Sequence, residues 1–192
     1  MRALQTRRWT REEYDQLIEH GVVREGERIE LIEGEIIPKM TQHVPHVVGF
    51  SLAEDALRSA FGLGFYVRTA QPLIAGDDSE PEPDLAVVPG SPRDYAKART
   101  HPMFALLVVE ISDSSLGFDR RQKARVYARA SSPEYWIINL QDRVVEVHRD
   151  PQVPERRPSS ARYATIVVYR EGDMIVPLHA PSARVAVSDL LP

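Results

Sequence analysis

The stretch LLVVEIS, residues 106–112, decides the fold because it is almost wholly apolar and yet carries a carboxylate. An apolar run of this kind is typical of a strand that is covered on both faces. The stretch PDLAVV, residues 83–88, also reads as a short buried strand, and Asp84 opens it. The stretch DRRQK, residues 119–123, opens a helix and brings a lysine. The sequence therefore predicts two buried strands with one acid each and a basic helix that follows them.

The composition is that of one globular domain, with 192 residues and a net charge of −4. A chain of this length buries most of its apolar surface without help from a metal or a disulfide. It contains no cysteine, which excludes disulfides, thiolate metal sites and thiol nucleophiles. The net acidity argues against a general nucleic-acid coat protein, whose binding face is usually basic. We expect a single domain over residues 1–192, with a core at about 28–150 and a C-terminal β extension at 151–192.

The sequence carries no signal for a membrane or for export. No apolar run approaches the roughly 20 residues that a membrane-spanning helix needs. Residues 1–10 include charges but lack the apolar segment of a secretory signal. Together with the absence of cysteine, these features lead us to expect a cytoplasmic protein that is not bound to a membrane.

The order of the predicted elements indicates an α/β fold, classed as α+β by some schemes, in which helices flank a mixed central sheet. An N-terminal helix is expected after the capping box formed by Thr10 and Glu13, and Gly21 is placed to end it. A strand pair or bent strand is expected at residues 28–40 and a loop at residues 150–160. The remaining predicted helices lie at 46–61 and 118–130, and the remaining predicted strands at 65–74, 84–88, 104–112, 134–139, 144–148, 165–170 and 174–178.

Asp84, Glu110 and Lys123 are the candidate catalytic residues. Hydrolysis of a phosphodiester needs a hydroxide aimed at phosphorus and positive charge to neutralise the charge that develops. Hard divalent ions such as Mg²⁺, with Mn²⁺ as a substitute, bind carboxylate and carbonyl oxygens, which the two acids and the backbone carbonyl of Ile111 would supply. Lys123 would then orient the attacking water or stabilise the developing charge.

Simpler interpretations of the same residues remain open at this point. Glu110 could lie just past the sheet edge in water instead of in a buried site. Asp119 and Lys123, four residues apart on one helix face, could form an ordinary surface salt bridge of a few tenths of a kcal/mol. Whether Asp84, Glu110 and Lys123 meet in one pocket therefore decides between these interpretations.

Several motifs resemble, in register over roughly residues 10–150, those of one bacterial family. They are EPDLAVV at 82–88, VVEISDSS at 108–115, Asp119 with Lys123 and Tyr127, and PEYWII at 133–138. The family is the putative restriction endonuclease family, once catalogued as a domain of unknown function, of the PD-(D/E)XK nuclease superfamily. The resemblance implies a restriction-endonuclease-like core with extra N-terminal helix and strands and C-terminal strands, Mg²⁺ dependence and cleavage of nucleic acid.

The resemblance assigns roles to particular residues and shows one departure. Asp84 matches the motif aspartate and Glu110 the (D/E) position. The superfamily lysine belongs two residues after that acid, where this chain has Ser112. The family draws its lysine from the next helix, which makes it Lys123 here.

Further residues are candidates for supporting roles. Glu35 or Glu30 would add a carboxylate near the metal, and a solvated strand edge is the alternative for at least one of them. His46 would contact phosphate or a metal-bound water, or else cap or pack its helix. Gln71 would point into the cleft, and Tyr127 would support Lys123 or pack. The supporting set is Glu35, His46, Gln71, Ser112, Asp119 and Tyr127.

Arg120, Arg121 and Arg125 are the candidate contacts to nucleic acid, because they crowd one short helix. A solvated helix face is the alternative interpretation. The expected partner is DNA. A homodimer is also expected, because cutting both strands of a duplex favours paired active sites, and the apolar segments after Ser160 would form the contact.

Two other functions are compatible with the sequence. The first is a nuclease-fold protein that binds nucleic acid or a protein partner without cutting, which Ser112 at the usual lysine position and the net acidity favour. The second is an acid/base hydrolase that uses Asp84 and Glu110 on a sugar. Such a hydrolase needs two carboxylates at a defined separation but leaves Lys123 without a role.

Overall fold

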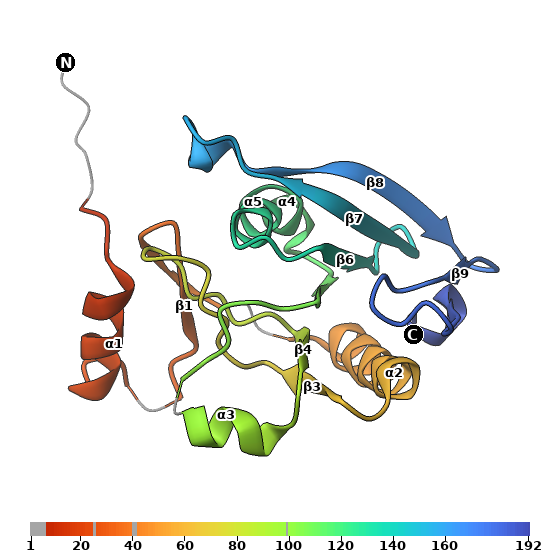
Figure 1. Cartoon of the computed structure of the whole chain (residues 1–192), viewed down its shortest axis with the longest axis horizontal. Helices are drawn as coiled ribbons and strands as arrows, with labels where there is room; N and C mark the ends of the chain where they lie inside the picture. The colour runs from red at the N-terminus through yellow and green to blue at the C-terminus, as the bar shows by residue number, and fades with distance from the viewer. Residues whose placement is uncertain (1–6, 25, 40–41, 99) are drawn as a thin grey trace.

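A six-stranded mixed sheet forms the centre of the molecule (Figure 1). The computed structural model describes residues 7–24, 26–39, 42–98 and 100–192. Within this part of the chain the strand order is β3-β4-β5-β6-β7-β8; β5 and β6 are parallel, and all other neighbours are antiparallel. The strands are β3 (Phe65–Thr69), β4 (Leu85–Pro89), β5 (Leu107–Ser112), β6 (Glu134–Asn139), β7 (Val144–Gln152) and β8 (Arg162–Arg170).

Helices cover both faces of the sheet, so the predicted α/β architecture is confirmed (Figure 1). On one face α2 (Val44–Phe61) packs its buried residues against alternate residues of the strands. The C-terminal segment with β9 (Met174–Ile175), β10 (Val185–Ala186) and η3 (Val187–Asp189) completes that layer. The other face is covered by a helical segment composed of α4 (Leu116–Phe118), the π-helical turn η1 (Asp119–Lys123) and α5 (Ala124–Arg129).

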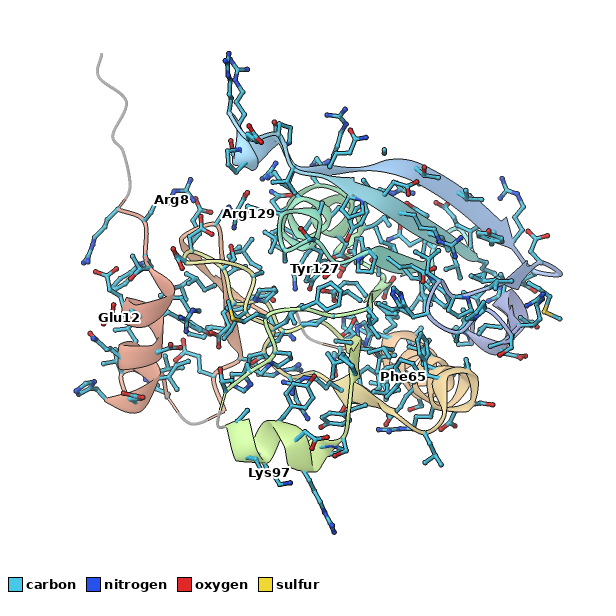
Figure 2. All side chains as sticks on the ribbon, viewed as in Figure 1. Arg8, Glu12, Phe65, Lys97, Tyr127 and Arg129 are labelled. Carbon is cyan, nitrogen blue, oxygen red and sulfur yellow. The ribbon has the colours of Figure 1, made fainter. Side chains whose placement is uncertain are left out.

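Burial on both faces explains why β5 and β6 contain few polar residues. All six residues of each of these strands are buried. The side chains alternate between the two layers, as the pleat of a strand requires. In β5, for example, Val109 packs on the α2 side and Val108 on the α5 side. Tyr127 of α5 lies in the interior, whereas Lys97 points away from the molecule (Figure 2).

The N-terminal part forms the predicted helix and strand pair. The helix α1 (Arg11–Glu19) begins with the capping box of Thr10 and Glu13. The hairpin consists of β1 (Ile29–Ile32) and β2 (Glu35–Pro38). Its two-residue turn has positive φ at Glu33 and at Gly34, and a Cβ on Gly34 would lie 2.8 Å from the Arg8 side chain. Met40, the end of the predicted strand pair, lies outside the described residues.

The structure differs from the sequence prediction in several connections. A short helix, α3 (Pro92–Ala98), lies in the region expected to be an irregular loop. Strand β7 continues to Gln152, past the boundary predicted at His148, because β8 pairs with it along its whole length, and η2 (Pro158–Ser160) follows. Proline and the positive φ of Asp150 signal a loop locally, and cross-strand pairing overrides this signal.

Glu80 is a buried carboxyl at the back of the hairpin. The backbone of Glu80 pairs with that of Leu31, and Glu80 is only 5% exposed. Burial, with a smaller effect of the charge of Asp15, raises the pKa of Glu80 to about 7, although Arg11 acts in the opposite direction. The folded state therefore favours the protonated form, and the stability that this form provides is lost as the pH rises from about 4.5 towards 7.

We predict that Glu80→Gln stabilises the protein at pH 8 but not at pH 4. The amide keeps the shape of the protonated acid and removes the charge that burial disfavours. The gain at pH 8 should be about 1 kcal/mol, once solvent screening of this carboxyl is allowed for. Urea unfolding at the two pH values measures it, and Glu19→Gln, at an exposed position of α1, is the control. An equal effect of Glu80→Gln at both pH values would contradict the prediction.

Candidate active site

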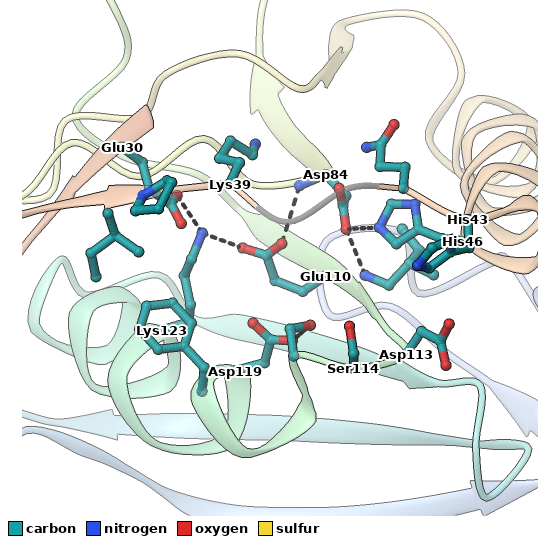
Figure 3. Close-up of a pocket in the computed structure, with 16 residues that line it drawn as sticks. Glu30, Lys39, His43, His46, Asp84, Glu110, Asp113, Ser114, Asp119 and Lys123 are labelled. Atoms are coloured by element: carbon teal, nitrogen blue, oxygen red, sulfur yellow. Dashed lines mark hydrogen bonds and ion pairs between the residues drawn. The ribbon is translucent and has the colours of Figure 1, made fainter. Parts of the chain in front are cut away.

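Asp84, Glu110 and Lys123 line one cavity of about 240 Å³ (Figure 3). The cavity lies where the β1–β2 hairpin, the start of α2, the beginning of β4, the end of β5 and the helical segment η1 meet. Its polar lining residues include Glu30, Lys39, His43, His46, Asp84, Glu110, Asp113, Ser115, Asp119 and Lys123.

The antiparallel register of β4 and β5 brings the two candidate acids together. Leu85 pairs with Val109, so the residue before Leu85 lies beside the residue after Val109. These two residues are Asp84 and Glu110, and the Asp84 N–H lies 3.4 Å from Glu110 Oε2. An acid that opens one strand and an acid near the end of the next therefore meet at the same edge of the sheet.

Asp84 is held in place by two hydrogen bonds to one oxygen. The Ile111 N–H donates to Oδ2 at 2.8 Å, and His46 Nε2 lies 3.1 Å from the same atom (Figure 3). Burial raises the pKa of Asp84, but the hydrogen bonds and positive charge of His46, together with the Ile111 N–H, outweigh burial and lower the pKa below its usual value. Asp84 is thus a buried carboxylate that is kept ionised.

His46 lies in the first turn of α2 and faces the sheet. Burial lowers its pKa, but the hydrogen bond and charge of Asp84 outweigh this effect, so that the pKa is raised. Its other ring nitrogen, Nδ1, is buried and has no hydrogen-bond partner among the described residues. His46 therefore contacts a side chain of the site: through Nε2 it holds the carboxylate of Asp84 in its orientation.

Glu110 has a different environment from Asp84. Its Oε1 accepts hydrogen bonds from Tyr127 Oη at 2.5 Å and from Lys123 Nζ at 3.1 Å. Burial raises the pKa of Glu110, and the nearby charge of Asp84 adds to this effect, whereas Lys123 opposes it; the net pKa is raised. Burial also raises the pKa of the Tyr127 hydroxyl, which therefore remains a donor to Glu110.

Lys123 is buried between two glutamates from distant parts of the sequence. Its Nζ lies 2.6 Å from Glu30 Oε2 and 3.1 Å from Glu110 Oε1 (Figure 3). Burial lowers the pKa of Lys123, but the charges of Glu110 and Glu30 outweigh burial and raise it, so the ammonium form persists. The sequence allowed a surface salt bridge between Asp119 and Lys123. The structure contradicts this interpretation, because both residues are only 3% exposed.

The π-helical turn η1 sets the direction of two of these side chains. Asp119 and Lys123 are the first and last residues of this turn, and both are buried. A widened turn of this kind is often found at functional sites. Asp119 Oδ2 accepts hydrogen bonds from Ser112 Oγ at 2.6 Å and from Ser115 Oγ at 2.5 Å. Ser112, at the usual lysine position, therefore contacts Asp119, and burial raises the pKa of that acid.

Four of the six supporting residues do not line the cavity. Ser112 and Tyr127 contact its lining residues Asp119 and Glu110, whereas Glu35 and Gln71 lie away from it, which corrects the sequence prediction. Glu35 is exposed and forms an ion pair with Arg8 at 2.7 Å. It stands beside the hairpin turn, two cross-strand pairs away from Glu30, so Glu30 and not Glu35 reaches the site. Gln71 donates to Tyr66 Oη at 3.2 Å and lines a separate cavity.

The three candidate arginines do not form one free basic face. Arg120 binds Glu146 through Nη2 at 2.6 Å, and Arg125 binds Glu33 through Nε at 2.7 Å. Both guanidinium groups are thus engaged with carboxylates of the same chain. Arg121 is exposed.

Sequence reasoning missed Lys39. Its Nζ donates to the Glu82 carbonyl at 2.6 Å, and its side chain lines the cavity. The chain has 21 arginines but only three lysines, at positions 39, 97 and 123. Two of the three line this cavity, so the scarcity of lysine was a signal that applied to Lys39 as well as to Lys123.

The donor atoms fit a hard divalent cation only in part. No group of three or more His, Asp or Glu side chains in the described part of the chain has the arrangement of a metal site. Asp84 and Glu110 provide two carboxylates, and each keeps one oxygen that is less engaged than the other. The third oxygen would come from the backbone. Ile111 directs its N–H to Asp84, and in a strand the carbonyl of a residue points to the same side as its N–H.

We predict that Lys123→Met lowers the free energy of unfolding by about 3–5 kcal/mol, because Glu30 and Glu110 would remain buried without a cation. Urea unfolding measures this loss. Lys97→Met, which removes an exposed lysine of α3, is the matched control. Adding Glu110→Gln to Lys123→Met should restore part of the loss, because one unpaired charge disappears. A loss below about 1 kcal/mol would mean that the cluster contributes no more than a surface pair.

No helix in the described residues is long and apolar enough to cross a membrane. No curated protein matches the chain. The structure is similar to the crystal structure of a putative nuclease belonging to DUF820 from Anabaena variabilis ATCC 29413, with a TM-score of 0.65 and 18% sequence identity. The match covers 84% of this chain and 88% of that chain, and it supports the nuclease-like fold. The model of the Uma2 family, described as putative restriction endonuclease, matches residues 11–187, and the chain therefore belongs to this family.

Proposed function

We propose that this protein is a divalent-metal-dependent endonuclease that cleaves phosphodiester bonds of DNA. The observation that carries the proposal is the meeting of the buried residues Asp84, Glu110 and Lys123 in one cavity. Membership in a family of putative restriction endonucleases supports a nuclease-type activity, and the name of that family favours DNA as the substrate. We further propose that the protein acts as a homodimer, since a duplex has two strands to cut.

The oxygen-rich donor set favours Mg²⁺, with Mn²⁺ as a substitute. Asp84, Glu110 and the Ile111 carbonyl would hold the ion. Once bound, such an ion supplies a Lewis acid and lowers the pKa of a water molecule. The acids lie in a cavity where burial strengthens their attraction for a cation.

The side chains around the acids hold them in place before substrate arrives. His46 and the Ile111 N–H fix one oxygen of Asp84, and Tyr127 fixes one oxygen of Glu110. Such preorganisation avoids the cost of reorienting the ligands during the reaction. Lys123 places an ammonium next to Glu110, from which it can stabilise negative charge on the phosphate that is attacked.

We predict that Glu110→Gln and Asp84→Asn each reduce plasmid cleavage in Mg²⁺ or Mn²⁺ by more than about 100-fold. The amide loses the charge that holds the cation, which corresponds to several kcal/mol of charge stabilisation. Glu19→Gln, at an exposed position of α1, is the control and should cleave as the wild type does. Equal cleavage by wild type and Glu110→Gln would remove Glu110 from the proposed site.

Thermal unfolding provides a readout that does not depend on turnover. A cation that binds only the folded state raises the melting temperature as its concentration increases. Mn²⁺ should therefore stabilise the wild type and Glu19→Gln but not Glu110→Gln. An identical Mn²⁺ response in all three proteins would show that the ion binds elsewhere.

A second candidate function is a nuclease-fold module that binds nucleic acid without cutting it. The contacts of Lys123 favour this alternative, because its ammonium is already engaged by Glu30 and Glu110. Binding of a labelled DNA duplex would then persist in EDTA, and it would weaken with salt by the slope of a few phosphate contacts. Turnover combined with a strict need for metal in binding would reject this alternative.

A further inference from the structure

Strand β8 is a long open edge of the central sheet. It is the last strand in the sheet order, and within the described residues it pairs only with β7 (Figure 1). It has nine residues, whereas β3 at the opposite edge has five. An edge strand presents a row of unpaired N–H and C=O groups along its outer side, and these groups can pair with a strand from another chain.

The middle of this edge is apolar and exposed on both faces of the sheet. Ile166, Val167 and Val168 are 56%, 42% and 47% exposed. Ile166 and Val168 lie opposite His148 and Glu146 of β7, on the α5 side, and Val167 lies opposite Val147, on the α2 side.

Edge strands are usually protected from pairing by charges, proline or bulges. The segment between Arg162 and Arg170 contains no charged residue and no proline. Its four consecutive β-branched residues, Thr165 to Val168, instead favour an extended, paired conformation. The edge therefore lacks the features that normally prevent a sheet from continuing into another molecule.

We propose that two copies of this chain form a symmetric dimer by antiparallel pairing of their β8 strands, with Val167 of each copy opposite the partner's Val167. Ile166 of each copy then lies opposite the partner's Val168. A two-fold contact is self-complementary, so one apolar strand provides both surfaces.

The charges at the ends of β8 favour this register over the one centred on Ile166. With Ile166 at the two-fold axis, Arg162 would lie opposite the partner's Arg170, and this repulsion would occur twice. With Val167 at the axis, Arg162 instead lies beside the partner's turn that follows β8. That turn carries the carboxylates of Glu171 and Asp173. The chosen register thus replaces two like-charge contacts with two attractive ones.

The two-fold axis of this pairing is perpendicular to the sheet, so the two sheets join into one of twelve strands. The helical segments that carry Lys123 then lie on the same face of the joined sheet. This dimer provides a surface for the homodimer of the proposed function. The inference rests on β8 and the turn that follows it, because neither the register nor the test depends on cleavage.

Cysteine cross-linking tests the register directly, because the chain has no cysteine of its own. In Val167→Cys the two sulfurs come from residues that face each other, with Cα atoms about 4.5–5.5 Å apart, which a disulfide can bridge. In Ile166→Cys the two copies of the residue are diagonal neighbours about 7–8 Å apart, which is too far for a good disulfide. Leu63→Cys, fully exposed before β3, is the control for random collision.

Mild oxidation should give a covalent dimer in high yield for Val167→Cys and only background yield for Ile166→Cys and Leu63→Cys. Efficient cross-linking of Ile166→Cys with little for Val167→Cys would overturn the register. Cross-linking of Val167→Cys no better than that of Leu63→Cys would overturn the contact itself.

Opposite charges at the axis test the dimer without oxidation. Light scattering should give twice the chain mass for the wild type. It should give the chain mass for Val167→Lys and for Val167→Glu, because like charges would face each other. Mixing the two variants should restore the dimer, and circular dichroism checks that each remains folded. A wild-type monomer at every concentration, or a wild-type dimer that persists in both variants, would overturn the proposal whether or not the protein cuts DNA.

Discussion

The ammonium of Lys123 joins three parts of the chain that the sequence keeps far apart. It contacts Glu30 in the hairpin and Glu110 in the central sheet, and it belongs itself to the helical segment on the sheet face. Burying two carboxylates in this position is unfavourable without a cation, and burying one lysine is unfavourable without anions. The hairpin, the sheet and the helix are therefore held in one arrangement by a small set of charges, and the cavity is a consequence of that arrangement.

The sequence predicted the layers of this fold well, because the signals for them are local. Runs of buried apolar residues gave β5 and β6, and the boundaries of β6 were predicted correctly. The capping box at Thr10 placed α1, and Gly62 marked the end of α2. Where tertiary contacts decide the structure, the local signals failed. Pairing with β8 extends β7 through Pro151, and α3 forms in a segment that proline and arginine made look irregular.

The site was predictable in its residue types but not in its geometry. Glu110 was a candidate because a charge at the end of an apolar strand is costly to bury, and Asp84 was a candidate because it opens another predicted buried strand; both arguments need only the sequence. Their meeting depends on the register of β4 against β5, which no local pattern encodes. The sequence could not decide between Glu30 and Glu35 for a similar reason. Both lie on one hairpin, and only the position of that hairpin relative to the sheet determines that Glu30 lines the cavity. Lys39 was overlooked because it lies near the end of the strand pair predicted at residues 28–40, where no motif marks it.

The two acids of the cavity are held by opposite means, and this difference bears on how a cation would be received. Asp84 accepts hydrogen bonds that lower its pKa, so it is a fixed negative charge. Glu110 has a raised pKa, and its main compensating charge is Lys123. A cation that entered would give Glu110 a second positive neighbour and weaken its dependence on the lysine. In the proposed enzyme, Lys123 would therefore take two roles in turn: it neutralises the buried acids in the protein alone, and it would provide positive charge for a substrate once another cation shared that task.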